Sequence, residues 1–147
     1  MKIQEEGEKL LLFQMFEVHK LIAYKSNKIF SQDGVDIQIE QVPVLMIPYY
    51  MGILSQQEIA DRVLRDKSSI LRTVSSLTQM GLIVVAADPF DKRRKLVQLT
   101  KEGKALAAKI AGELHKVDQQ VFECLSDIEL VSFRKILVKL ASNLSSE

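Results

Sequence analysis

The stretch LSQQEIADRVLRDKSSILRTVSSLTQMGLIVVAADPFDKRRKLVQL (residues 54–99) decides the expected fold, because it reads as two helices, a strand, a basic loop and a second strand. The first helix has a clear start. Ser55 can accept a hydrogen bond from the Glu58 N–H, and the Glu58 carboxylate can accept one from the Ser55 N–H, which is the capping-box pattern. A second N-cap follows at Asp66. The two predicted helices are therefore joined by a very short turn.

The second helix of this stretch has an apolar side and a polar side. At 100° per residue, Ile70, Val74 and Leu77 gather on one side. The opposite side carries Ser68, Arg72, Ser75, Ser76 and Gln79. Short hydroxyl side chains let a backbone approach phosphates, and an arginine can reach a guanine edge in the major groove. The pattern predicts the recognition helix of a helix-turn-helix.

A β-hairpin is expected after Gly81, which ends the second helix. Its strands are the β-branched run at residues 82–87 and the shorter run at residues 96–99. The connection at residues 88–95 is longer than the usual hairpin loop of about 2–5 residues. It ends in four consecutive cations, which are Lys92, Arg93, Arg94 and Lys95. A cationic hairpin in this position is expected to act as a wing that contacts phosphates or a narrow minor groove.

Over residues 41–106 the chain resembles the MarR family of winged helix-turn-helix transcription regulators. The most specific motifs are Gly81-Leu82, Asp91-Lys92-Arg93-Arg94 and Leu99-Thr100-Lys101-Glu102-Gly103. The resemblance implies that Arg93 enters the minor groove and that Asp91 orients the wing through ion pairing. Among the departures from the family pattern, Pro48 replaces a typical leucine and is expected to bend or end the helix that carries it.

The expected fold is mainly α-helical with a small β-hairpin wing. A winged helix-turn-helix DNA-binding domain is expected at residues 36–100, and a helical dimerisation region at residues 1–35 and 101–147. Long apolar stripes on the expected end helices predict the dimer interface, and the resemblance implies the same arrangement. The residues of this interface are Leu11, Met15, Val18, Leu130, Phe133, Leu137, Leu140 and Leu144.

The composition is that of an ordinary globular chain, with 47% hydrophobic and 27% charged residues over 147 positions. Residues 62–104 hold ten Lys/Arg and four Asp/Glu, a net charge of +6, so the remainder carries −5 of the overall +1. Such concentrated basicity is typical of a nucleic-acid surface. One cysteine excludes an internal disulfide framework, and neither a signal peptide nor a long apolar run is evident. The protein is expected to be cytoplasmic, with no membrane partner.

Two interpretations of the aromatic residues stay open. Family members carry a small-molecule pocket between their dimer and DNA domains, which implies an unidentified effector here. Aromatic residues and methionines at helical spacing are, however, more often part of a core. The pocket candidates are Phe13, Phe16, Tyr24, Met46, Tyr49 and Tyr50.

No catalytic residue, cofactor or metal site is expected. His19 and His115 lie on separate expected helices, without cysteine or carboxylate neighbours at metal-ligand spacing. Cys124 is interpreted as a plain thiol, because the sensing cysteine of redox-responsive family members lies in the first helix. An enzyme is disfavoured, because no nucleophile with its base and no paired carboxylates emerge.

These features predict a homodimeric, sequence-specific regulator of transcription that binds double-stranded DNA. It is expected to be a repressor that a small molecule or other signal releases. Two recognition helices related by a two-fold axis require a pseudo-palindromic operator with half-sites ~34–36 Å apart. The alternative is a winged-helix module for protein–protein assembly, because the fold alone does not fix function. The expected DNA contacts are Lys67, Ser68, Ser69, Arg72, Ser75, Ser76, Lys92, Arg93, Arg94 and Lys95.

Overall fold

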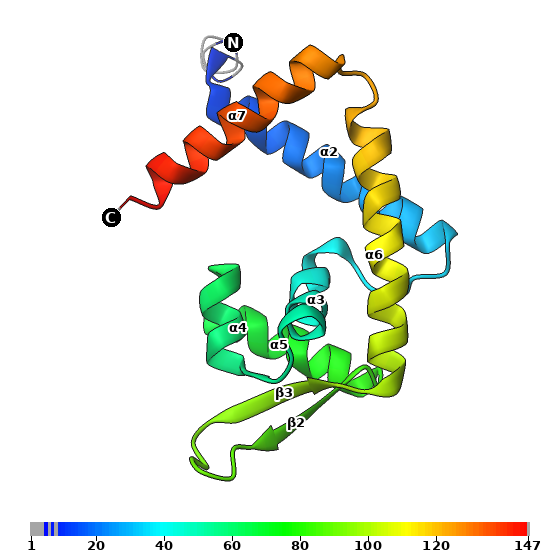
Figure 1. Ribbon diagram of the computed structural model, residues 1–147, viewed down its shortest axis with the longest axis vertical. Helices are drawn as coiled ribbons and strands as arrows, with labels where there is room; N and C mark the ends of the chain where they lie inside the picture. Colours follow the sequence, from blue (N-terminus) through cyan, green and yellow to red (C-terminus); the bar gives the residue numbers. More distant parts are fainter. Residues whose placement is uncertain (1–4, 6, 8, 147) are drawn as a thin grey trace.

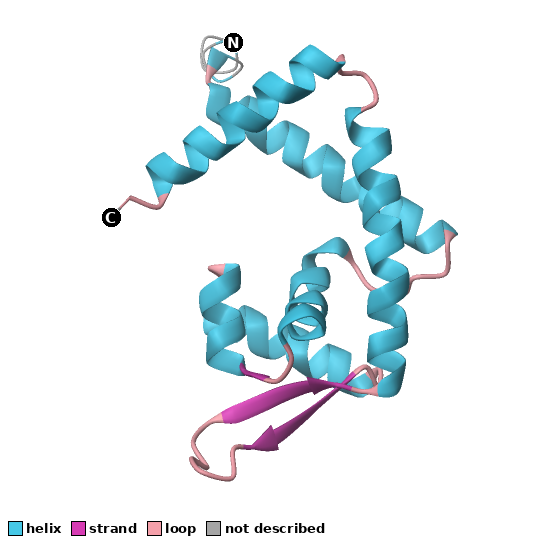
Figure 2. Ribbon diagram, viewed as in Figure 1, coloured by secondary structure: helices cyan, strands magenta, loops and turns pink. Residues whose placement is uncertain are grey.

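The computed structural model describes residues 5, 7 and 9–146, which are mainly helical with one small antiparallel sheet (Figures 1 and 2). This confirms the expected mainly α fold with a β-hairpin wing. The elements in chain order are α2 (Leu11–Gln32), the 3-10 helix η1 (Ile39–Gln41), α3 (Val42–Met51), β1 (Leu54–Ser55), α4 (Gln56–Val63), α5 (Lys67–Gln79), β2 (Ile83–Ala87), β3 (Lys95–Leu99), α6 (Lys101–Phe122) and α7 (Asp127–Leu144).

Four helices begin at N-cap residues that the sequence pattern predicts, which are Ser55, Asp66, Thr100 and Ser126. At α4, the Ser55 hydroxyl accepts the N–H of Glu58 at 3.1 Å, and the Glu58 carboxylate accepts the N–H of Ser55 at 2.7 Å. Asp66, Thr100 and Ser126 cap α5, α6 and α7 by the same kind of side-chain acceptance. These starts are local events, because each cap and its partner lie three residues apart.

The sheet is larger than the predicted hairpin. Its strand order is β1-β3-β2, and both pairs are antiparallel. The two-residue strand β1 was not predicted, because it is too short to leave a pattern of its own. Lys95 was expected in the loop but begins β3, where it pairs with Ala87. The prediction is wrong at this residue because strand pairing needs only the backbone, while the charged side chain stays exposed.

Two predicted helix bounds also shift. The apolar pattern predicts a first helix from Glu8 to Phe30. Its predicted start lies outside the described residues, and α2 runs on to Gln32. Helix α3 does not end at Pro48, which lies inside it, although an interior proline has no N–H to donate and its ring crowds the preceding turn. The helix continues to Met51, and the N–H of its C-cap residue Gly52, whose φ is 83°, donates to the Pro48 carbonyl at 2.9 Å.

The β-hairpin is fixed to α6 by contacts around Thr100. The Thr100 hydroxyl donates to the Gly81 carbonyl at 2.6 Å and accepts the Gly103 N–H at 3.0 Å. The Thr100 N–H donates to the Leu82 carbonyl at 3.0 Å. A Cβ at position 103 would collide with that carbonyl oxygen. These contacts explain why a Gly-Leu pair and a Leu-Thr-x-x-Gly motif occur together.

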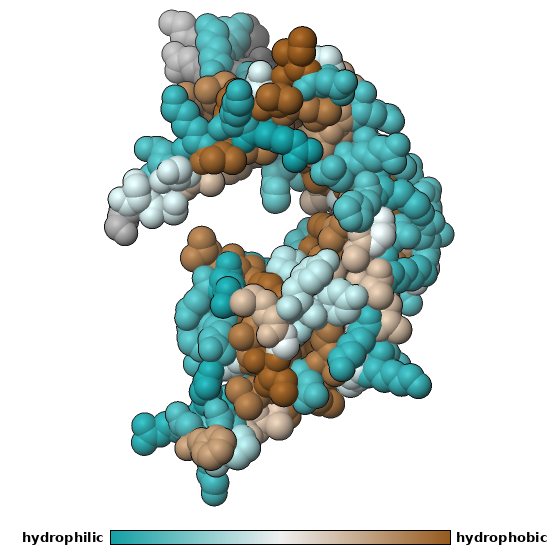
Figure 3. Space-filling model, viewed as in Figure 1, coloured by the Kyte–Doolittle hydropathy of each residue, from teal (hydrophilic) through white to brown (hydrophobic). Residues whose placement is uncertain are grey.

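The hydrophobic core lies mainly in the lower part of the view in Figure 1, between α3, α4, α5, the sheet and α6, and it includes Ile29 and Phe30 at the end of α2. Its fully buried side chains include Leu45, Ile59, Leu77, Val97 and Ile110. Helix α7 contributes no buried residue. In the space-filling view the molecule is C-shaped, and an open gap separates the end of α7 from the compact lower part (Figure 3).

The core includes residues from both predicted regions, so the predicted domain bounds stay a prediction. Within the described part of the chain, no helix is long and apolar enough to cross a membrane.

Candidate nucleic-acid interface

The two sides of α5 lie as the sequence predicts. Ile70, Val74 and Leu77 are buried. The opposite side exposes Lys67, Ser68, Arg72, Ser75 and Gln79. This side offers short hydroxyls and a guanidinium group, which can donate hydrogen bonds to phosphates and to base edges.

Two of the expected DNA contacts on α5 face the protein instead of solvent. The Arg65 guanidinium donates to the Ser69 hydroxyl at 2.8 Å and to the Glu40 carbonyl at 2.7 Å. The Gln41 side chain donates to the Ser76 hydroxyl at 3.4 Å. Both serines are half-buried. Their partners lie before α4 or in the turn that precedes α5, so they hold the flank of α5 against its neighbours.

The wing between β2 and β3 is closed by its own backbone. The Asp88 N–H donates to the Arg94 carbonyl at 2.9 Å, and the Arg94 N–H donates to the Asp91 carbonyl at 3.0 Å. The Asp88 carboxylate accepts the Phe90 N–H at 2.9 Å, and the Asp91 carboxylate accepts the Arg93 N–H at 3.1 Å. Asp side chains commonly stabilise turns in this way. The tip of the wing is therefore held in a defined conformation.

Arg94 anchors the wing to α4. Its guanidinium lies 2.9 Å from the Glu58 carboxylate and 3.4 Å from that of Asp88, which is 8% exposed. The Ser55 N–H, and then Arg94, hold the pKa of Glu58 below its usual range. Glu58 thus caps α4 and binds the wing at once. A residue pattern read locally does not reveal this pair, because Glu58 and Arg94 are far apart in the chain.

These contacts bear on the expected roles of Asp91 and Arg94, which stay predictions. Asp91 orients the wing through the Arg93 backbone N–H, while the ion pairs of the wing are made by Arg94 with Glu58 and Asp88. The carboxylate of Asp91 is occupied by the turn that it closes. The exposed guanidinium of Arg94 in turn pairs with the carboxylates of Glu58 and Asp88. All four cations of the wing are exposed, but within the described part of the chain only Arg94 among them lies within ion-pair distance of a carboxylate.

The six pocket candidates lie in different surroundings. Phe13 and Phe16 are exposed on α2, with ring centroids 6.3 Å apart. Tyr24 lies eleven residues beyond Phe13, which is about 16 Å along a helix. Met46 is buried in the core, whereas Tyr49 and Tyr50 contact each other with ring centroids 5.1 Å apart. Tyr49 also lines a cavity of about 280 Å³.

Neither histidine nor the cysteine lies in an obvious reactive site. His19, His115 and Cys124 are exposed. In the described part of the chain, no group of three or more His, Cys, Asp or Glu side chains could hold a metal ion.

The predicted dimer residues are exposed, apart from the half-buried Leu130. Brown apolar side chains lie among teal polar ones over the upper part of the molecule, where α2 and α7 lie (Figure 3). A cavity of about 320 Å³ between the end of α6 and α7 is lined in part by Leu130, Phe133 and Leu137.

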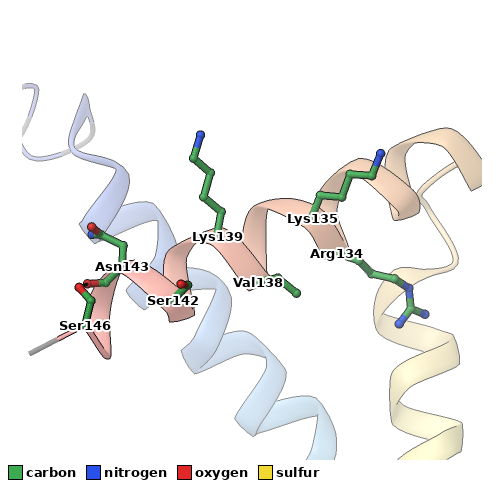
Figure 4. Close-up of a pocket in the computed structure, with 7 residues that line it drawn as sticks. All are labelled: Arg134, Lys135, Val138, Lys139, Ser142, Asn143 and Ser146. Atoms are coloured by element: carbon green, nitrogen blue, oxygen red, sulfur yellow. Dashed lines mark hydrogen bonds between the residues drawn. The ribbon is translucent and has the colours of Figure 1, made fainter.

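A second hollow lies on α7 alone (Figure 4). Its polar groups do not converge, because Lys135 and Lys139 point to one side and Arg134 points to the other.

A sequence model of the MarR family matches residues 35–94. A protein assigned as the transcriptional regulator of the hcr operon of Thauera aromatica is 34% identical over 87 residues, which are 59% of this chain and 52% of that protein. The chain thus spans about half the length of this curated relative.

Two solved structures share the fold. One, assigned as a transcriptional regulator from Pseudomonas aeruginosa, has a TM-score of 0.80 and 25% identity, covering 90% of this chain and 98% of that chain. The other is the MepR–DNA complex of S. aureus, with a TM-score of 0.81 and 24% identity, covering 91% and 98%.

Proposed function

We propose that the chain, whose residues 35–94 match a sequence model of the MarR family, is a member of that family of transcription regulators and a sequence-specific regulator that binds double-stranded DNA. The observation that carries the proposal is the placement of cations. Arg72 lies on the exposed side of α5, and Lys92 and Arg93 lie on a wing that is held in place by Arg94. The DNA complex of MepR, which has the same fold, supports the proposal.

In the proposed complex, α5 lies in a major groove and the wing reaches the adjacent minor groove. Lys67, Ser68, Arg72 and Ser75 are the proposed contacts of the helix. Lys92, Arg93 and Lys95 are the proposed contacts of the wing, where an arginine in a narrow minor groove meets an enhanced negative potential. Ser69, Ser76 and Arg94 position these elements from the protein side.

We propose further that the active form is a homodimer. Two observations support a dimer. Helices α2 and α7 expose many apolar side chains, and a largely apolar cavity lies between α6 and α7. A chain of this size rarely exposes so much apolar surface without a partner. A two-fold dimer requires a pseudo-palindromic operator with half-sites ~34–36 Å apart. A dimer bound there excludes other proteins from the same DNA, so we propose repression as its mode of action, relieved when a small molecule reorients the wings.

The test is selection of bound duplexes from a random pool, followed by affinity measurements on the selected and a scrambled duplex across a salt series. The proposal predicts enrichment of a pseudo-palindrome and a linear fall of log affinity with log salt, because each phosphate contact releases counterions. A protein–protein assembly module has no phosphates to neutralise. Absence of both enrichment and salt dependence would favour that alternative.

A further inference from the structure

Phe90 lies at the tip of the wing and is 98% exposed. A single exposed hydrophobic residue is common on protein surfaces, so the exposure of Phe90 alone does not indicate a binding site. Two further observations distinguish this residue. Its backbone is fixed, and its neighbours are cations.

The backbone of Phe90 is held from both sides. Its N–H donates to the buried carboxylate of Asp88 at 2.9 Å, and the preceding Pro89 has a restricted φ. Asp88 is in turn bound to Arg94 through its backbone N–H and through its carboxylate. The ring is therefore presented to solvent by a turn that loses little conformational freedom on binding, which favours affinity.

The neighbours of Phe90 indicate the chemistry of its partner. Lys92 and Arg93 follow within three residues and are exposed. An aromatic ring among cations fits a surface in which phosphates border an apolar layer. In duplex DNA the stacked bases form that layer, and apolar side chains inserted from the minor groove unstack and kink a base step.

We propose that Phe90 is a minor-groove wedge, which lies against or between base pairs beside Arg93 and selects a deformable step at each flank of the operator. Pyrimidine–purine steps such as TA unstack most easily, so they are the preferred partners. The inference rests on the proposed function, since it requires a wing that binds DNA. It adds a readout of deformability to the readout of bases by α5.

The variant Phe90→Ala tests the wedge cleanly, because the side chain buries almost nothing in the free protein and its removal leaves the fold intact. Affinity should fall about tenfold for an operator with TA steps under the wings, in the range seen when stacking aromatics are replaced by alanine. The affinity of Phe90→Ala should fall much less for an operator with stiff A-tracts under the wings. Phe90→Leu, which keeps an apolar wedge, should retain most of the affinity. Val84→Ala, which removes a half-exposed side chain on β2, is the matched control.

A second readout is the fluorescence of 2-aminopurine placed at the TA step, which rises when its stacking is lost. Wild type should raise it, and Phe90→Ala should not. Equal affinity and equal fluorescence for the two proteins would overturn the wedge while leaving the proposed function intact. Absence of salt-dependent DNA binding by wild type would overturn both.

A lipid surface is the other apolar layer bordered by phosphates. Vesicles of phosphatidylglycerol and phosphatidylcholine in equal parts test it directly. Binding to these vesicles that Phe90→Ala abolishes, together with unchanged operator affinity, would overturn the wedge in favour of a membrane contact.

Discussion

At position 103 only a hydrogen atom fits between α6 and the Leu82 carbonyl. Gly103→Ala should therefore lower the free energy of unfolding by about 1–3 kcal/mol, as overpacking does in other cores. Gly112→Ala is the matched control on the same helix, because nothing lies within 4 Å of the added Cβ. It should stabilise the helix by about 0.5–1 kcal/mol, because alanine loses less backbone entropy than glycine. Urea unfolding of both variants measures the difference, and equal effects would contradict the close contact.

Arg94 and Lys92 should differ in their effect on salt dependence, although each replacement by glutamine removes one positive charge. Lys92 is exposed and should contact a phosphate, so Lys92→Gln should flatten the plot of log affinity against log salt by roughly one unit per subunit. Arg94 is balanced by Glu58 and Asp88. Arg94→Gln should instead lower the affinity for selected and scrambled duplexes alike, because it releases the wing. The slope of log affinity against log salt should change less than in Lys92→Gln. The reverse order of slopes would return Arg94 to the phosphate role expected from the sequence.

The end of α2 is joined to α6 by charged side chains, because Asp33, which caps α2, faces Glu113 and Lys116 of α6. The buried Oε2 of Glu113 faces no hydrogen-bond donor in the described part of the chain. Lys116 lies 2.7 Å from Asp33 and 3.5 Å from Glu113, and Lys109 donates to the Asp33 carbonyl at 2.5 Å. The hydrogen bond with Asp33, and then burial, raise the pKa of Glu113, while Lys116 lowers the pKa of Asp33.

The shifted pKa values of Glu113 and Asp33 make the stability of the fold depend on pH in opposite senses. The raised pKa of Glu113 gives stability that is complete below its unfolded pKa and is lost as pH rises through its folded pKa. The lowered pKa of Asp33 gives stability that is present above its unfolded pKa and is lost as pH falls through its folded pKa.

Glu113→Gln should therefore have the melting temperature of wild type near about pH 4 and a melting temperature about 2–4 °C higher near about pH 8, because the amide stays neutral and can still donate to Asp33. Thermal unfolding across this range measures the effect, with the exposed Glu123→Gln as control. Parallel pH profiles for wild type and Glu113→Gln would show that Glu113 does not carry the effect.

The elements also show what a single sequence can predict. Helix starts at Ser55, Asp66 and Thr100 were predictable because cap and partner are three residues apart. The sequence did not reveal strand β1. It also did not reveal that Arg94 pairs with Glu58 and that Arg65 donates to Ser69, so Arg94 and Ser69 were assigned to DNA. Strand β1 and the Arg94 pair depend on segments that only the fold brings together, and the orientation of Arg65 depends on how the turn before α5 is built.

In the molecule as a whole, α7 lies apart from the hydrophobic core and has no buried residue. Leu137→Glu combined with Leu140→Glu should therefore leave the core folded but separate the proposed dimer and weaken operator binding. Sedimentation and circular dichroism measure the two effects. Lys139→Glu is the control, because Lys139 is an exposed charged residue of the same helix and points to the side opposite Arg134 (Figure 4). A double variant that sediments as a dimer would contradict the proposed interface.

The central claim is that α5 reads bases while the wing supplies cations and an apolar contact. The most direct measurement is the ratio of affinities for selected and scrambled duplexes in wild type, Arg72→Ala and the control Arg134→Ala, which replaces an exposed arginine on α7. We predict that Arg72→Ala lowers this ratio by the equivalent of about 1–3 kcal/mol per half-site and relaxes the preference at one base pair in each half-site. Arg134→Ala should leave the ratio unchanged. An unchanged ratio in Arg72→Ala, with the ratio lost on Lys92→Gln instead, would contradict the account.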